Sequence, residues 1–269
     1  MGKYVTAAEA VQVVKSGDRV YVQAAAATPT ILTKALTDRA SELRNVELCH
    51  LHTEGDAPYA NPELAESFHV NSFFIGANVR HTLKAGNGSY TPVFLSELPL
   101  LFRKNVVKLD VAFIHVSPPD SHGYCSLGVS VEASVAAIEN AKIVVAQVNP
   151  QMPRTFGDGI LHVSEIDYLV DVNLPIYAHD VAPFTAEEEK IGAYVASLIE
   201  DKSTLQMGIG SIPNAALSKL TNHKDLGLHT EMFSDGVIDL IENDVINCNY
   251  KGTLRGRALA TFLMGSKRL

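Results

Sequence analysis

The fold is decided by the stretch LDVAFIHV, residues 109–116, together with the similar stretch KIVVAQV, residues 142–148. Between them lies SVEASVAAIEN, residues 130–140, an alanine-rich segment of helical character. Nearly unbroken apolar strands joined by helices are typical of a parallel sheet that is buried on both faces. The sequence therefore predicts an α/β fold, with a mostly parallel sheet covered by helices on both faces.

The alternation of strands and helices continues toward the amino terminus. Thr6-Ala7-Ala8-Glu9 has the form of a capping box, which marks the start of a helix. Thr28-Pro29 has the form of an N-cap followed by proline at the first helical position. The expected elements are a helix from Thr6 to Gly17, a strand over 18–23, a helix from Thr28 to about Arg44 and a strand over 46–51.

A second set of alternating elements follows a stretch without periodicity at 172–183. Thr185-Ala186-Glu187-Glu188 is another capping box and starts it. We therefore expect one α/β domain over 1–184 and the start of a second α/β unit over 185–269. Its expected elements are a helix from Thr185, strands over 203–207, 227–230 and 258–264, and helices over 213–220 and 235–243.

The final residues suggest that this second unit is incomplete. Residues 258–265 are typical of a central strand, and Ser266-Lys267-Arg268-Leu269 reads as the beginning of a helix. A parallel strand needs a crossover connection that covers the sheet. We therefore expect either that the chain is a fragment or that a partner covers that face.

Composition excludes several classes of function. The chain has 269 residues, 46% hydrophobic and 19% charged, with a net charge of -8 and no basic stripe. These values indicate a globular protein that does not bind nucleic acid. We expect neither a membrane span nor a signal peptide. Cys49, Cys125 and Cys248 are widely spaced and predict buried thiols in a reduced cytoplasm rather than disulfides or a structural zinc site.

Two neighbouring strand–helix junctions carry the main functional signal. Glu231 lies in LHTEMFSDGV, residues 228–237, near the end of one expected strand and just before a helix start. The turn Gly208-Ile209-Gly210-Ser211-Ile212 follows the strand before it. Ligands of open α/β sheets bind in the crevice at the carboxyl ends of the strands. One junction would thus offer backbone amides and the other a carboxylate.

Each of these features also has a structural interpretation. The glycine turn lacks the third glycine of a dinucleotide fingerprint and has no P-loop lysine, so by itself it indicates only a tight turn. Glu231 by itself could cap the following helix. His50, His52 and Glu54 alternate along one strand, but three ligands on one strand rarely surround an ion, and we expect no metal site. His122, in the loop over 117–128, reads as a surface turn histidine.

The chain resembles the acetyl-CoA hydrolase/transferase family, and within it the 4-hydroxybutyrate CoA-transferases, followed by the butyryl-CoA:acetate transferases. The matching stretches occur in family order across most of the chain. They are SPPD at 117–120 through GVS at 128–130, HVSEID at 162–167, LIED at 198–201, GIGSIPNA at 208–215, HTEMFSDG at 229–236 and TFLMGSKRL at 261–269.

The resemblance implies specific roles. Glu231 would be the nucleophile, and Gly208, Ile209, Gly210, Ser211 and Ile212 would contact coenzyme A. The substrates would be acyl-CoA and small carboxylic acids, with 4-hydroxybutyrate or butyrate and acetyl-CoA as the expected pair. The family is cytoplasmic, commonly homodimeric and needs no metal. Members extend well past this carboxyl end, so two alternatives remain: an acyl-CoA hydrolase using the same glutamate, and a non-catalytic half that binds coenzyme A.

Overall fold

The computed structural model describes residues 2–179 and 183–269, which form two compact units, Met1–Tyr177 and Ala178–Leu269. The division falls between 177 and 178, inside the aperiodic stretch that the sequence places at 172–183. Within the described residues, no helix has the length and apolar character needed to cross a membrane.

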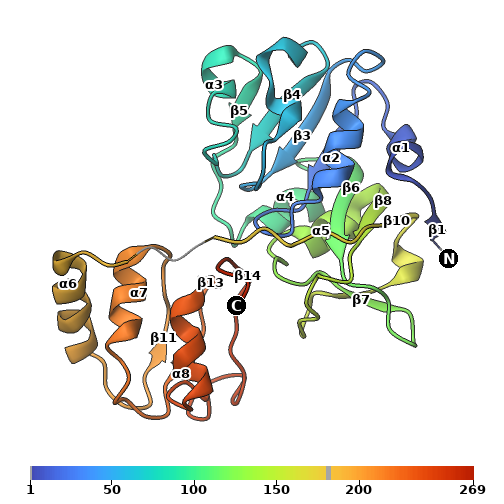
Figure 1. Ribbon diagram of the computed structural model, residues 1–269. Coiled ribbons are helices and arrows are strands. Elements are labelled where there is room, and N and C mark those ends of the chain that lie inside the picture. Colours follow the sequence, from blue (N-terminus) through green and yellow to red (C-terminus); the bar gives the residue numbers. More distant parts are fainter. Residues whose placement is uncertain (1, 180–182) are drawn as a thin grey trace. The chain divides into compact units, whose positions relative to one another are not determined.

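The first unit is built on an eight-stranded sheet in which every neighbouring pair is parallel. Figure 1 shows its strands flanked by helices. In spatial order the strands are β1 (Lys3–Tyr4), β10 (Tyr168–Asp171), β8 (Ala141–Val148), β6 (Leu109–Val116), β2 (Arg19–Val22), β3 (Val46–His50), β4 (Phe68–Ser72) and β5 (Gly88–Tyr90). The helices are α1 (Ala7–Ala10), α2 (Thr30–Thr37), α3 (Thr82–Ala85), α4 (Leu98–Arg103) and α5 (Ser134–Asn140).

Both faces of this sheet are buried, which confirms the predicted fold class. In β2, Val20 and Val22 pack into a core that includes α1 and α2, whereas Tyr21 packs into a second core with α4 and α5. Successive side chains of a strand point to opposite faces, so a strand covered on both sides must be apolar throughout. This explains the nearly unbroken apolar sequence of β6 and β8.

The order of the strands reverses at β2. The chain moves from β2 outward through β3, β4 and β5, then returns to the other side of β2 with β6 and continues through β8 and β10. Such a reversal leaves a crevice at the carboxyl ends of the central strands, where ligands of α/β proteins bind. A two-stranded antiparallel ribbon, β7 (Tyr124–Ser126) with β9 (Ile160–His162), lies apart from the main sheet.

Three predicted helices of this unit have different bounds. The helix expected from Thr6 to Gly17 is α-helical only over Ala7–Ala10 and continues as a 3₁₀ turn over Val11–Val13. The N-cap of α2 is Pro29 rather than Thr28. The helix ends at Thr37 rather than near Arg44, because i→i+3 bonds such as Ala40 N–H to Thr37 O replace the α-helical pattern. Helix α5 begins at Ser134 rather than Ser130, because Glu132 has φ +27°. The Glu132 carboxylate accepts a hydrogen bond from the Tyr21 hydroxyl at 2.7 Å instead.

The second unit contains helices packed beside short parallel strands (Figure 1). Its elements are α6 (Ala186–Ser197), β11 (Thr204–Leu205), α7 (Ser211–Ser218), β12 (Gly227–Leu228), β13 (Met232–Phe233), α8 (Ile238–Glu242) and β14 (Phe262–Leu263). Strand β11 pairs with β12, and β13 pairs with β14. Bridges of Leu226 with Ile246 and of His229 with Leu259 extend this pairing.

The capping boxes predicted at Thr6 and Thr185 are both present. In the second, the Thr185 hydroxyl accepts from Glu188 N–H at 3.2 Å, and the Glu188 carboxylate accepts from Thr185 N–H at 2.7 Å. Helix α7 begins at Ser211 instead of Pro213. Pro213 is tolerated in the first turn of α7, because the backbone N–H groups of the first turn form no hydrogen bonds within the helix.

Candidate active site

The segment that carries Glu231 is held by its neighbours on both sides. Buried Thr230 ties it to the end of β11, because its hydroxyl accepts from Met207 N–H at 2.9 Å and lies 2.9 Å from the Met207 carbonyl oxygen. The backbone carbonyl of Glu231 accepts from the Thr261 N–H and hydroxyl, both at 2.8 Å. The Glu231 side chain is exposed and forms no hydrogen bond or ion pair within residues 2–179 and 183–269.

The predicted glycine turn leads directly into α7. Gly210 is the N-cap residue and has φ +114° and ψ -177°, a backbone conformation that is essentially restricted to glycine. The helix begins at Ser211, and its third residue, Pro213, has no N–H. The amides of Ser211 and Ile212 are therefore the first-turn donors that the helix itself leaves unused. Such amides at a helix N-terminus favour an anion or a carbonyl oxygen.

A cavity of about 320 Å³ opens beside this turn, entirely within the second unit. Three of the five predicted turn residues line it, namely Ile209, Gly210 and Ser211. Gly208, Ile212 and Glu231 do not, although Met232, the next residue after Glu231, does. The other lining residues are His179, Phe184, Asn214, Ser234, Asp235, Met264 and Gly265. The cavity is mainly apolar, with a few polar groups, as is typical of small-molecule sites.

The sequence analysis assigned no role to Asp235, which organises one wall of the cavity. Its carboxylate accepts from Ser266 N–H at 2.7 Å and also from the Ser266 hydroxyl. A Cβ atom on Gly265 would lie 2.1 Å from an Asp235 carboxylate oxygen, so a side chain at this position would displace that carboxylate. The neighbouring Ser234 hydroxyl donates to the Asn214 side-chain oxygen at 2.7 Å. The stretches 229–236 and 261–269 are thus joined by side-chain contacts.

The start of α7 is also tied to the start of α6. The Ser211 hydroxyl hydrogen-bonds to the Glu188 carboxylate, which at the same time completes the Thr185 capping box. These bonds lower the pKa of Glu188, with the Ser211 hydroxyl as the largest cause. The hydroxyl of Ser211 is therefore engaged, and its backbone amide is the group available to a ligand.

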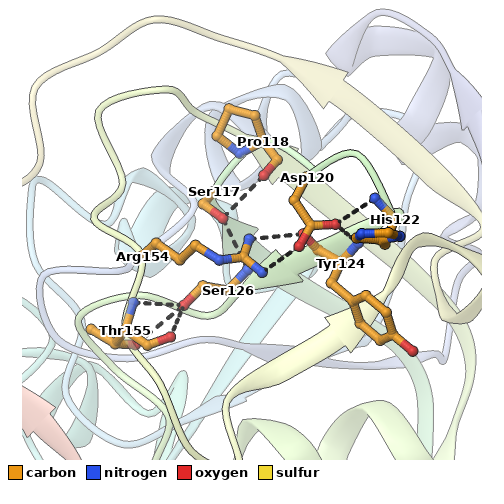
Figure 2. A network of polar contacts seen from close by, with 8 residues as sticks. All are labelled: Ser117, Pro118, Asp120, His122, Tyr124, Ser126, Arg154 and Thr155. Atoms are coloured by element: carbon orange, nitrogen blue, oxygen red, sulfur yellow. Dashed lines mark hydrogen bonds and ion pairs between the residues drawn. The ribbon is translucent and has the colours of Figure 1, made fainter.

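The loop over 117–128 in the first unit is held by a network of hydrogen bonds (Figure 2). The Asp120 carboxylate accepts from the backbone N–H of His122 and Tyr124, each at 2.9 Å, and pairs with Arg154 at 2.8 Å. These contacts lower the pKa of Asp120, with the Tyr124 N–H as the largest cause. The His122 ring is exposed at the surface, as the sequence predicts.

Other candidate groups are engaged within the fold. His50 is buried, with Nδ1 2.6 Å from the Leu51 carbonyl oxygen and Nε2 3.1 Å from the Tyr59 hydroxyl, so neither ring nitrogen is available to a metal. Across the described part of the chain, no group of three or more His, Cys, Asp or Glu side chains is arranged to hold an ion. The three cysteines are free and buried, and burial raises the pKa of Cys125 to about 11.

Comparisons with known proteins identify what this arrangement resembles. The family model of the acetyl-CoA hydrolase/transferase N-terminal domain matches residues 1–178. The succinyl-CoA:acetate/propanoyl-CoA:succinate CoA transferase of Fasciola hepatica is 45% identical over 95% of this chain and 54% of that protein. The 4-hydroxybutyrate coenzyme A transferase of Clostridium kluyveri is 43% identical over 99% of this chain and 62% of that protein.

The solved structures give the same result. The crystal structure of a 4-hydroxybutyrate CoA-transferase from Porphyromonas gingivalis superposes with a TM-score of 0.86 at 38% identity. The match covers 99% of this chain and 64% of the crystal structure's chain. The chain thus spans between about half and two thirds of the length of these relatives.

Proposed function

Because this chain belongs to the acetyl-CoA hydrolase/transferase family, we propose that it carries the nucleophile of a CoA-transferase and that this nucleophile is Glu231. The observation that carries the proposal is the exposure of the Glu231 side chain and its lack of a hydrogen-bond or ion-pair partner among the described residues. Glu231 is an exposed carboxylate without a partner among the described residues, on a backbone fixed by Thr230 and Thr261. A carboxylate used only as a cap or in an ion pair would be engaged by the fold.

The proposed reaction is a two-stage acyl exchange. The Glu231 carboxylate attacks the acyl-CoA carbonyl, the thioester C–S bond breaks, and a mixed anhydride and the CoA thiolate form. The thiolate then attacks the glutamyl carbonyl, which gives a glutamyl-CoA thioester and releases the first acid as its carboxylate. A second carboxylate reverses both steps and leaves as the new acyl-CoA. Covalent catalysis of this kind divides one difficult transfer into easier ones.

The glycine turn is the proposed contact for coenzyme A, through Gly208, Ile209, Gly210, Ser211 and Ile212. The unused amides of Ser211 and Ile212 at the start of α7 are donors suited to an oxyanion or a carbonyl oxygen. We propose 4-hydroxybutyrate or butyrate with acetyl-CoA as the substrate pair. Two relatives are named for 4-hydroxybutyrate and for butyryl-CoA with acetate, and two others are named for succinyl-CoA. From family membership we further propose a cytoplasmic homodimer that needs no metal.

The exposure of Glu231 supports a second candidate function, acyl-CoA hydrolysis. Water that reaches the glutamyl thioester would release free coenzyme A and end the exchange, because a transferase must exclude water from that intermediate. The two activities differ in their products. The transferase incorporates labelled acetate into acetyl-CoA, whereas the hydrolase releases thiol without incorporation.

The test is an exchange assay with labelled acetate and acetyl-CoA on the wild type and two variants. Glu231→Gln keeps the size of the side chain but removes the nucleophile, so exchange should fall by at least about a thousandfold. Glu231→Asp withdraws the carboxylate by one methylene, and a displacement of that size costs about a hundredfold. Wild-type exchange by Glu231→Gln would refute the assignment, and thiol release without exchange would favour the hydrolase.

A further inference from the structure

Helix α6 of the second unit buries its smallest side chains. Figure 1 shows α6 beside α7 at one edge of that unit. The buried residues of α6 are Gly192 and Ala196. A Cβ atom on Gly192 would lie 2.6 Å from the backbone carbonyl carbon of Ala215 in α7. The two helices therefore approach backbone to backbone, which leaves no room for large side chains between them.

The large apolar side chains of α6 are exposed instead. Four of them recur with the spacing i, i+3, i+4, i+7, so they form one continuous stripe along the helix. This apolar stripe consists of Ile191, Tyr194, Val195 and Leu198, which are 40%, 74%, 39% and 83% exposed. Single apolar residues are common on protein surfaces, but a continuous patch of them marks an interaction site.

The charge of α6 disfavours a membrane or a nucleic acid as the partner. The first turn of the helix carries Glu187, Glu188 and Glu189, and the whole chain has a net charge of -8. Amphipathic helices that bind membranes are rich in lysine and arginine, because many lipid headgroups are anionic. An anionic surface would repel α6, so the apolar stripe fits the surface of a protein.

The spacing of the apolar stripe makes it complementary to itself. When two α6 helices run antiparallel about a two-fold axis at the middle of the stripe, Ile191 lies opposite Leu198 of the second copy, and Tyr194 lies opposite Val195. Each contact then occurs twice. Antiparallel packing also brings the positive end of each helix dipole close to the negative end of the other. We propose that a second copy of this chain packs on the apolar stripe in this antiparallel arrangement.

The area of the apolar stripe sets the strength of the proposed dimer. From their exposed fractions, the four residues present on the order of 500 Å² per copy, so a pair would bury about 1,000 Å². This area is near the lower limit of specific interfaces, and we expect a weak dimer whose population depends on concentration. The inference rests on the homodimer proposed above and names its surface, and it does not depend on the role of Glu231.

Sedimentation velocity of the whole chain over a concentration series tests the surface. The wild type should dimerise reversibly, and Leu198→Lys should weaken the dimer at least about tenfold, because two ammonium groups would be buried without partners. Lysine suits the carboxyl end of a helix, so the fold should persist. The matched control is Val106→Lys, at an exposed residue of the first unit, and it should dimerise like the wild type.

Two results of this experiment would overturn the proposal. A wild type that stays monomeric at the highest soluble concentration would refute both the homodimer and its surface. A dimer of unchanged strength in Leu198→Lys would refute the surface and leave the homodimer standing. The exchange assay on the Glu231 variants is a separate measurement, so failure of the catalytic proposal is distinguishable from both results.

Pairwise cross-linking tests the orientation of the two copies. The three native cysteines are buried, so cysteines introduced into the apolar stripe should be the reactive ones. A short bismaleimide should link a mixture of Ile191→Cys and Leu198→Cys chains much more than either variant alone. Val106→Cys, mixed with either variant, gives the background. Equal linking of the mixture and the single variants, or none above background, would overturn the antiparallel arrangement.

Discussion

Replacing Gly210 by alanine tests whether the turn before α7 binds coenzyme A. With φ +114° and ψ -177°, Gly210 occupies a region that other residues enter at a cost of roughly 1–3 kcal/mol. A Cβ atom at this position would meet nothing within 4 Å, so the effect comes from the backbone and not from a clash. In Gly210→Ala the turn should relax to a backbone conformation that alanine favours. A ligand that needs the original conformation must then restore it on binding. Affinity should then fall by about 5- to 150-fold.

Gly157→Ala is the matched control. Gly157 has φ +101° and equally open surroundings, but it lies in the first unit and outside the cavity beside the turn. Calorimetric titration with acetyl-CoA should give weaker binding for Gly210→Ala and unchanged binding for Gly157→Ala, while both substitutions lower the free energy of unfolding. Equal affinities for the wild type and Gly210→Ala would refute the role of the turn, as would an equal loss in Gly157→Ala.

Three further predictions concern stability, each measured by urea unfolding. Burial lowers the pKa of His50 and His115 to about 4, so both rings stay neutral in the folded chain, whereas in the unfolded chain they bind protons below pH 6.5. The free energy of unfolding should therefore fall as the pH drops from 6.5 toward 4. A flat profile would contradict this. Gly192→Ala places a Cβ 2.6 Å from the backbone of Ala215 and should cost about 1–3 kcal/mol, whereas Gly252→Ala, with open space, should be nearly neutral. Arg154→Met removes a partly exposed ion pair and should cost less than about 1 kcal/mol. Asp120→Ala also leaves two backbone N–H groups without their acceptor and should cost more; the reverse order would contradict the account of this loop.

Elements fixed by local sequence were predictable. The capping boxes at Thr6 and Thr185 depend on residues three apart. The strands β6 and β8 could be predicted because their mainly apolar composition itself indicates burial on both faces. The start of α5 was not predictable, because Glu132 leaves the helical conformation to reach Tyr21, a residue 111 positions away. Helical periodicity contains no information about such a contact.

The same distinction applies to the candidate sites. Gly210 and its neighbours could be singled out because a strand, a glycine turn and a helix follow one another in sequence. The pairing of Asp235 with Ser266 depends on residues about 30 positions apart that the fold brings together. Glu231 is not among the residues that line the cavity, a detail that no sequence pattern contains.

The central claim is that Glu231 forms a covalent thioester with coenzyme A. The most direct measurement is peptide mass spectrometry of the chain after incubation with acetyl-CoA and trapping with hydroxylamine or borohydride. The account predicts a hydroxamate or a reduced alcohol on Glu231 and on no other carboxylate, dependent on acetyl-CoA. An unmodified Glu231 under conditions in which exchange is detected, or modification of another residue, would contradict it.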